Sequence, residues 1–260
     1  ESGRVYLLKN LIGEPIANIC RGSRKDLRDS IVSNRKAQSG WAKRSAYNKG
    51  QILYRIAETL EGRKAQFVES FIRQGLLPAA AIQETEAAID LLVYYAGWCD
   101  KYIQVFSSVN PVESSHFNFS YHEPMGVLTV IAPEESGLLG MVAAIAPMII
   151  GGNAITVLAS EKYPMTAIDF AEVLHASDVP GGVVNIITGY RKEFLSHAAS
   201  HMDVNGIVYS DLTAEQRKLV QTNAAGNVKR VVDFSKEEMA TPYRILSGQE
   251  VKTTWHPIGS

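Results

Sequence analysis

The stretch that decides the fold runs from Val127 to Ile150 and reads V-L-T-V-I-A-P-E-E-S-G-L-L-G-M-V-A-A-I-A-P-M-I-I. Its first five residues are apolar or β-branched and predict a buried strand, and residues 139–149 predict a helix. The turn between them contains glycine, and α/β proteins use such turns to present a loop to a phosphate or a reacting group. Two acidic residues, Glu134 and Glu135, stand in this loop, and any role given to the chain has to account for them.

Short apolar strands alternate with helices on the carboxyl-terminal side of this stretch. Strands are expected at 154–158, 183–187, 206–209 and 228–234, and helices at 166–176, 192–199 and 213–222. Apolar strands that alternate with helices of about ten residues are typical of a parallel sheet covered on both faces. The sequence therefore predicts an α/β fold with a Rossmann-like, doubly wound parallel sheet.

The amino-terminal part reads as a hairpin followed by an N-terminal helical layer. The expected elements are strands at 4–10 and 14–20 and helices that begin at Ser23, at Ser45 and before Phe67, with a long helix from Pro78 to about Phe106. Ser23 precedes the first helix as an N-cap, and apolar residues recur at helical spacing in all four.

Two further segments read as strands that leave the body of the fold. H-F-N-F-S-Y-H (116–122) alternates and places its aromatic residues on one side, and Y-R-I-L (243–246) and V-K-T-T-W (251–255) follow near the end. We expect 116–122 and the terminal segment to pair with each other and with another domain or subunit, because an exposed aromatic edge strand invites aggregation. The alternative is that they only close the sheet of their own domain.

These segments divide the chain into three parts of one structural unit. Residues 1–110 are expected to form the hairpin and helical part, and residues 111–240 the Rossmann-like part with the first projecting strand. Residues 241–260 are expected to supply the last projecting strand.

Composition excludes several classes of protein. The 260 residues are 46% hydrophobic and 20% charged with a net charge of −1, which gives no general attraction to nucleic acid or anionic lipid. No apolar run approaches the ~20 residues of a membrane span. Cys20 and Cys99 are far apart and neighbour apolar or aromatic residues, which favours buried thiols in a reducing compartment. The expected location is the cytoplasm.

The sequence gives only weak indications of a metal site or of an acid–base pair. His197 and His201 lie four residues apart on an expected helix, but no third ligand accompanies them, so no metal is expected. Glu84, Glu86 and Asp90 resemble an acid–base group only by composition, and solvated helix faces explain them at least as well.

Several runs resemble one family in order and in register. They are Y-H-E-P-M-G-V-L-T-V-I-A-P, I-A-P-M-I-I-G-G-N-A-I-T-V-L, P-G-G-V-V-N-I-I-T-G-Y, S-H-M-D-V-N-G-I-V-Y and N-V-K-R-V. Together they resemble the nucleotide-binding half of the aldehyde dehydrogenase superfamily from about Ser45 to Val232. The resemblance implies that the two projecting segments form the family's oligomerisation flap, a hairpin that adds strands to the sheet of a neighbour.

The sequence departs from this family at positions that face the cofactor and the substrate. After Pro133 the resemblance implies Trp-Asn, and the asparagine would stabilise an oxyanion, but Glu134 and Glu135 stand there. Leu158 replaces the lysine that would bind the adenosine ribose, while Glu161 of the same motif is kept. A donor amide and a cation have thus become an anion and an apolar side chain.

The pyrophosphate and adenine positions differ in the same way. Asp211 and Leu212 stand where a Gly-Ser would meet the pyrophosphate at a helix start, and Arg191-Lys192 stands where the adenine side would have Gly-Pro. The motif of the general-base glutamate is changed to V-D-F-S-K-E-E (232–238), in which Asp233 or Glu237 could be offered as substitutes but both glycines are gone.

A family member would continue into a catalytic domain that holds the nucleophilic cysteine. Cys20 and Cys99 lie outside the Rossmann-like part with no adjacent histidine or lysine, so we expect packing roles for both. The sequence therefore predicts no catalytic residue and no bound cofactor in this chain, although the parent family uses NAD. The vestigial cofactor positions are Pro133, Glu135, Leu158, Glu161, Asp211 and Leu212.

These features resemble the truncated second module at the carboxyl terminus of aldehyde dehydrogenase family 16, and next the similar terminal domain of the long proline utilization enzymes. The chain would then be a noncatalytic structural module whose partner is a protein: it docks on, or dimerises, an NAD-dependent aldehyde dehydrogenase. Two other hypotheses stay open. The chain could be an active NAD-dependent fragment that oxidises aldehydes to carboxylic acids, or a complete subunit that associates with a separate dehydrogenase.

Overall fold

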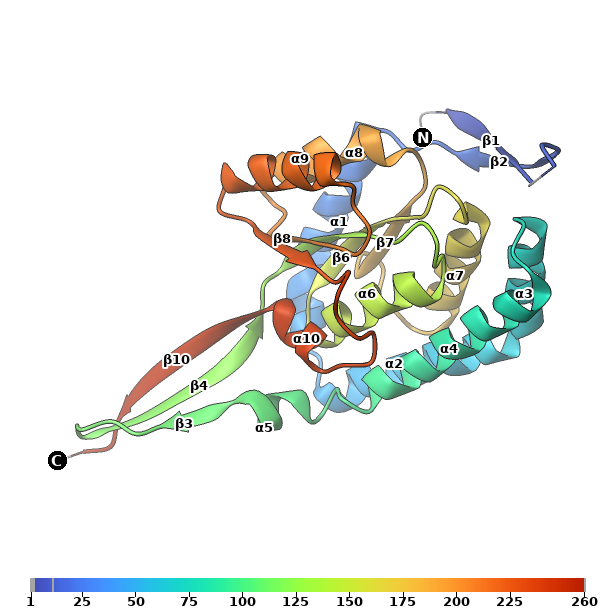
Figure 1. Cartoon of the computed structure of the whole chain (residues 1–260). Coiled ribbons are helices and arrows are strands. Elements are labelled where there is room, and N and C mark those ends of the chain that lie inside the picture. The colour runs from blue at the N-terminus through green and yellow to red at the C-terminus, as the bar shows by residue number, and fades with distance from the viewer. Residues whose placement is uncertain (1–2, 11, 260) are drawn as a thin grey trace.

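A five-stranded parallel sheet forms the centre of the structure, a computed structural model that describes residues 3–10 and 12–259. Its strands lie in the order β7 (Val184–Ile187), β6 (Ala154–Leu158), β5 (Val127–Ile131), β8 (Gly206–Tyr209) and β9 (Arg230–Asp233) (Figure 1). All neighbouring pairs are parallel. The chain winds outward from β5 on one side and then returns to β8 on the other, so the order reverses between β5 and β8. The predicted doubly wound α/β fold is confirmed.

Burial on both faces explains why these segments are strands. Every residue of β5, β6 and β8 is buried, as expected for a parallel sheet covered by helices on both sides. β5 and β6 pair in register from Val127 opposite Ala154 to Ile131 opposite Leu158. Their carboxyl ends therefore finish at the same level, where the loops that follow meet.

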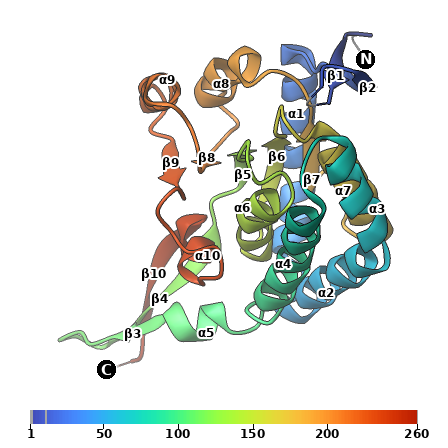
Figure 2. The ribbon, with the colours of Figure 1, turned by 45° about the vertical axis from the view of Figure 1, so that its right-hand side comes forward.

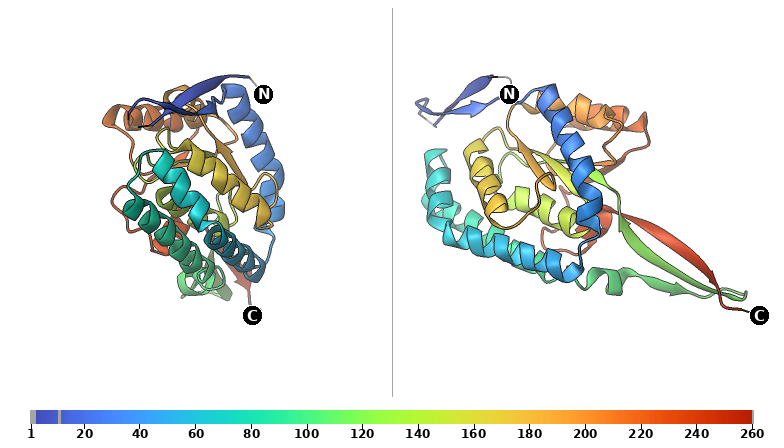
Figure 3. Two further views of the ribbon diagram at one scale, coloured as in Figure 1. Left: turned by 90° about the vertical axis from the view of Figure 1, so that its right-hand side faces the viewer. Right: turned by 180° about the vertical axis from the view of Figure 1, so that it is seen from behind.

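Helices cover both faces of the sheet. α1, α8 and α9 pack on one face, and α6 and α7 pack on the other (Figures 2 and 3). On that side α4 and α2 cover α6, and α2 and α3 lie beside α7. The bounds are α1 Arg24–Ala42, α2 Ala46–Gly62, α3 Lys64–Arg73, α4 Pro78–Ala96, α6 Leu139–Ile150, α7 Pro164–Ala176, α8 Arg191–Ser200 and α9 Ala214–Ala225. The predicted N-terminal helical layer is thus split, since α1 lies on the face opposite to α2, α3 and α4.

Polar contacts fix α1 against the sheet. Ser23 and Asp26 form a capping box at its start, as the N-cap serine predicts. The buried amide of Asn34 donates to the carbonyls of Ile155 (3.0 Å) and Gly182 (2.8 Å). At the other end Trp41 donates its Nε1–H to the carbonyl of Ile149 over 2.7 Å. The helix is therefore held along its whole length.

A separate antiparallel sheet projects from the body (Figure 1). β4 (His116–Pro124) pairs over its full length with β10 (Gln249–Pro257), which confirms the predicted pairing of these segments. The short β3 (Ser108–Asn110) lies on the other side of β4 and was not predicted. The rings of Phe117 and Phe119 lie 5.5 Å apart, so the aromatic residues share one side as expected. We call β3, β4 and β10 the flap.

Three predictions about local structure are wrong. The helix from Pro78 does not reach Phe106: α4 ends at Ala96, and a turn beginning at Gly97 separates it from α5 (Tyr102–Phe106). In this turn Trp98 lies against the rings of Tyr94 and Phe106. Residues 243–246 are not a strand, because they belong to the short helix α10 (Tyr243–Ser247).

The physical reason for α10 is a buried arginine. Arg244 donates to the carbonyls of Ala143 (3.2 Å), Phe234 (3.3 Å) and Glu237 (2.8 Å), which ties the segment to α6 rather than to the flap.

The third wrong prediction concerns Cys20. It ends β2 (Pro15–Cys20) of the hairpin, pairs with Val5 of β1 (Val5–Lys9), and is exposed rather than buried.

Candidate functional site

The site is the edge of the sheet where the carboxyl ends of the strands finish. In doubly wound folds ligands bind in the crevice outside these ends, at the point where the strand order reverses. Here that point lies between β5 and β8. Four segments meet there: the loop after β5, the loop after β6, the start of α8, and the loop after β8. They contain the positions singled out from the sequence.

Arg191 occupies the centre of this crevice. Its side chain is 5% exposed, and its Nε lies 2.7 Å from Glu134 Oε1. Its Nη1 donates to Asp211 Oδ1 over 3.0 Å, and its Nη2 donates to the carbonyl of Ala132. One guanidinium thus joins the loops after β5 and β8 to the start of α8. The bond to Asp211 joins two ionised groups, and such hydrogen bonds are about twice as strong as neutral ones. The contact with Glu134 is an ion pair without a hydrogen bond from Nε.

Glu134 joins the same network to the loop after β6. Its Oε2 accepts from the backbone N–H groups of Glu161 (2.8 Å) and Lys162 (3.1 Å) and from the hydroxyl of Ser160 (2.9 Å). Its own N–H donates to Asp211 Oδ2 over 2.6 Å. We call Arg191, Glu134, Asp211 and Glu161 the carboxyl-end network.

Carboxylates also satisfy the helix starts that face the crevice. Glu161 Oε1 accepts from the N–H of Arg191 over 2.7 Å at the start of α8. Glu84 of α4 accepts from the N–H groups of Leu138 (3.2 Å) and Leu139 (3.0 Å) at the start of α6. Such N–H groups are the donors that a bound phosphate would use. The interpretation of Glu84 as a solvated side chain is therefore wrong, because Glu84 lies on α4 and caps the start of α6.

The other positions play apolar or surface roles. Leu158 and Leu212 are 1% and 5% exposed and belong to the core between the sheet and α8. Pro133 is buried against Gly140, where an added Cβ would collide with its ring. Glu135 stays outside the network, since its exposed carboxylate pairs with Lys162 at the surface. The two glutamates of the loop thus have different environments.

The hairpin closes one side of the crevice. The ring of Tyr6 lies 5.1 Å from the ring of Tyr190, which precedes α8, and the hydroxyl of Tyr6 is buried without a hydrogen-bond partner among the described residues. Burial raises the pKa of Tyr6 far above its usual range, and the negative charges of Glu161 and Glu134 add to this effect. The phenol therefore stays protonated.

Comparison with known proteins identifies the fold's relatives. The family model of the aldehyde dehydrogenase family matches residues 3–233. The chain belongs to this family. The match extends the resemblance found in the sequence toward the amino terminus, because it includes the hairpin and α1.

Individual aldehyde dehydrogenase relatives are about twice as long as this chain. Retinal dehydrogenase 2 of Homo sapiens is 31% identical over 239 residues, which are 89% of this chain and 45% of that protein. Omega-crystallin of Enteroctopus dofleini is 29% identical over 235 residues, 88% of this chain and 47% of that protein. The chain thus spans a little under half the length of these relatives.

Solved structures share the fold. PnpE from Pseudomonas sp. WBC-3 superposes with a TM-score of 0.84 at 23% identity, over 89% of this chain and 47% of that one. An aldehyde dehydrogenase from Bacillus cereus gives a TM-score of 0.84 at 21% identity, over 88% of this chain and 47% of that one. At these identities the likeness concerns the arrangement of the backbone.

The cysteines of the chain lie away from the carboxyl-end network. Cys99 follows α4 and is buried, and burial raises its pKa to about 12, so its thiol stays protonated near neutral pH. Cys20 ends the hairpin strand β2 and is exposed. Neither contacts Arg191, Glu134 or Asp211 through any hydrogen bond or ion pair among the described residues.

The two histidines and the carboxylates near the end of β9 lie in separate surroundings. His197 lies on α8 and His201 caps its end, and over residues 3–10 and 12–259 no group of three or more metal-ligating side chains comes together. Asp233 lies 3.5 Å from Arg217 in an ion pair, and Glu237 is exposed.

Among the described residues, 3–10 and 12–259, no helix is long and apolar enough to cross a membrane.

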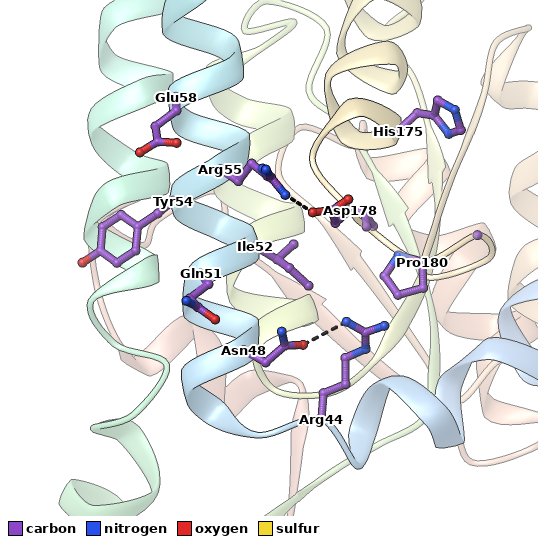
Figure 4. A pocket seen from close by; sticks show the side chains of 12 residues that line it. Arg44, Asn48, Gln51, Ile52, Tyr54, Arg55, Glu58, His175, Asp178 and Pro180 are labelled. Carbon is purple, nitrogen blue, oxygen red and sulfur yellow. Dashed lines mark hydrogen bonds and ion pairs between the residues drawn. The ribbon is translucent and has the colours of Figure 1, made fainter.

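A groove of about 1070 Å³ lies elsewhere, between α2 and the turn that leads into β7 (Figure 4). Two of its charged side chains are engaged with neighbours: Arg55 pairs with Asp178, and Arg44 donates to Asn48 over 2.9 Å. Neither cysteine lies on its wall. The groove is therefore separate from both cysteines and from the carboxyl-end network.

Proposed function

We propose that this chain is a noncatalytic, aldehyde-dehydrogenase-like structural module that docks on, or dimerises, an NAD-dependent aldehyde dehydrogenase. The observation that supports this most directly is the carboxyl-end network. The place where a doubly wound fold would hold a dinucleotide is filled by Arg191, Glu134 and Asp211. The chain there supplies its own anions to donors that a phosphate would otherwise meet.

A dinucleotide does not fit the side chains that line this crevice. A pyrophosphate at the start of α9 would meet the carboxylate of Asp211 and the apolar side chain of Leu212. The Arg191 guanidinium could attract phosphate only by giving up two carboxylates and a carbonyl. Glu134 and Asp211 would then lose the cation that compensates their charges. NAD is therefore no part of the proposed role of this chain.

Within the family, we propose the terminal module of family 16 as the best description, with the terminal domain of the long proline utilization enzymes next. In either protein a catalytic module would be the partner, and dimerisation of the chain itself is the second mode of association. The relatives include cytosolic aldehyde dehydrogenase 1 of Elephantulus edwardii, and we propose the same compartment here.

Titration with NAD tests the ligand part of this proposal. We expect no saturable heat on adding NAD up to the millimolar range in calorimetry, because no pyrophosphate site is open. A full-length NAD-dependent aldehyde dehydrogenase measured in parallel is the positive control. Saturable binding to this chain would contradict the proposal, and loss of that binding on changing Asp211 would locate the site in the crevice.

Sedimentation tests the docking part. The flap presents exposed apolar side chains, among them Val251 (61% exposed) and Trp255 (58%) on β10. We expect the chain to self-associate or to bind a catalytic aldehyde dehydrogenase module, and Val251→Lys with Trp255→Ser to weaken that association at least about tenfold, since aromatic anchors dominate interfaces. Tyr47→Ser, on exposed α2 away from the flap, is the matched control. A chain that stays monomeric with every such module contradicts docking.

A further inference from the structure

Basic side chains gather where the starts of α1 and α8 meet the hairpin. A depression of about 670 Å³ at this place is lined by Arg4, Ser23, Arg24, Lys25, Lys192 and Glu193. Arg24, Lys25 and Lys192 are exposed. Cations outnumber carboxylates on this wall, and an excess of one sign attracts ligands of the other.

The carboxylates nearby are already engaged. Glu193 accepts from Arg4 over 2.8 Å and is also paired with Arg21. Asp26 accepts from the N–H and from the hydroxyl of Ser23, each over 2.7 Å. Neither carboxylate is paired with Lys25 or Lys192 in any ion pair between described residues. The positive charge of the depression is therefore only partly compensated from within the chain.

The positive charge at the start of α1 affects His197 on the neighbouring helix α8. His197 of α8 has a pKa below its usual value, first because it is partly buried and then because the charge of Arg24 opposes its protonation. The field of Arg24 thus extends across the contact between α1 and α8. An anion bound in the depression would reduce the repulsion between the positive charges of Arg24, Lys25 and Lys192.

A second cavity, about 390 Å³ in volume, adjoins the depression beneath the hairpin. Its apolar wall is formed by Val5 of the hairpin and by Ile186 and Ile187 of the edge strand β7. Arg4 lines both cavities, so the apolar one opens beside the basic one. Its volume falls within the range of about 300–1,000 Å³ that is typical of small-molecule sites.

We propose that these two cavities together form a binding site for a small amphiphilic anion, a carboxylate or phosphate attached to an apolar body. The anionic head contacts Arg24, Lys25 and Lys192, and the body lies against Val5 and Ile187. None of the residues of the carboxyl-end network lines either cavity. No flap residue lines either cavity, so the site is separate from the proposed docking surface and from the crevice that we propose not to bind NAD.

Cys20 provides a local reporter, because it is exposed on the wall of the apolar cavity while Cys99 is buried. The experiment follows the rate at which neutral iodoacetamide alkylates Cys20 in the intact chain, by mass spectrometry, with decanoate below its micellar concentration. We expect saturable slowing of alkylation by decanoate and a clearly weaker effect of decanol, which has the same body without the charge. Decyl phosphate in a parallel arm shows which headgroup is preferred.

Two lysine variants then test the anionic half of the site. In Lys25→Ala/Lys192→Ala we expect the half-maximal decanoate concentration to rise about fivefold, in line with two partly exposed charge contacts, and the effect of decanol to stay the same. Lys36→Ala, which removes an exposed lysine further along α1, is the matched control and should behave as wild type. Absence of slowing overturns the proposal, and so does slowing that is equal for decanol or indifferent to the lysines.

Discussion

The two ends of the central sheet differ in what their polar residues do. At the amino ends, polar side chains satisfy backbone groups at and around the strand starts. The buried amide of Asn153 accepts from the N–H of Gly126 (2.9 Å) and donates to the carbonyls of Met148 and Gly248 (3.0 Å each). Asn205 accepts from the N–H of Val127 over 3.0 Å. These contacts fix where β5 begins relative to its neighbours.

At the carboxyl ends, polar side chains satisfy one another across loops. Arg191, Glu134 and Asp211 connect the segments that would surround a ligand. Asn153 and Gly152 are among the residues that match the family pattern in the sequence, whereas the ligand-facing positions depart from it. In this chain the start of the sheet is held by buried side-chain bonds to the backbone, whereas its ligand edge is held by ion pairs between loops.

The largest effect is expected at the amino end. Asn153→Ala removes three hydrogen bonds of a fully buried amide and leaves the N–H of Gly126 and two carbonyls without it, so we expect the free energy of unfolding to fall by about 3 kcal/mol. Urea unfolding followed by circular dichroism measures this. Asn223→Ala on α9, which loses a single exposed bond to the carbonyl of Leu219, should change stability by less than about 0.5 kcal/mol. If Asn153→Ala costs no more than Asn223→Ala, the buried hydrogen bonds at the amino ends do not stabilise the sheet as we infer.

A smaller effect is expected at the carboxyl end. Arg191→Met leaves Glu134 and Asp211 facing each other without their cation, and we expect a loss of about 2 kcal/mol, below the 3–5 of a fully buried pair because both carboxylates are partly exposed. Urea unfolding again gives the value. Arg28→Ala, which breaks an exposed pair with Asp29, is the control and should cost well under about 1 kcal/mol.

Further changes at the two carboxylates that pair with Arg191 test whether this loss of stability is caused by charge. Adding Glu134→Gln and Asp211→Asn to Arg191→Met removes the repulsion that the single change exposes, so we expect stability to recover in part. If the triple variant is no more stable than the single one, the network acts through the shape of Arg191 rather than through its charge.

The strands were predictable because their pattern is local. β5, β6 and β8 are apolar on both faces, and that property is visible in five or four consecutive residues. The flap pairing of β4 with β10 was also predictable, since the aromatic alternation of 116–122 needed a partner. The break after Ala96 was missed, because α4 and α5 are both apolar and only Gly97 marks the turn between them.

The carboxyl-end network was not predictable from spacing, because its members come from distant segments. Sequence reading treated Glu134 and Glu135 alike, and only the structure places one in the network and the other on Lys162. One signal could have found Glu84 and Glu161. The N-caps of α6 and α8 are Leu138 and Tyr190, which are not favoured capping residues and do not cap these helices with their side chains, so the acceptor comes from elsewhere in the chain.

The smallest effect concerns the hairpin that borders the carboxyl end. Hydrogen bonds from Arg21, and then from Arg4, lower the pKa of Glu193 to about 2, from the usual 4.5. A carboxyl group whose pKa is lowered in the folded state stabilises the fold above the usual pKa and ceases to do so as pH falls through the lowered value. This contribution is therefore present above pH 4.5 and is lost between about 4.5 and 2.

Glu193→Gln tests that contribution with thermal unfolding midpoints measured across this pH range. We expect the midpoint of the wild type to fall more steeply than that of the variant, and the two curves to converge toward pH 2, because the protonated glutamate resembles glutamine. Glu113→Gln, a change in the exposed loop before β4, should follow the wild type. Parallel curves for wild type and Glu193→Gln would mean that Arg4 and Arg21 do not hold the hairpin, and the crevice would then be bordered by Tyr6 and Tyr190 alone.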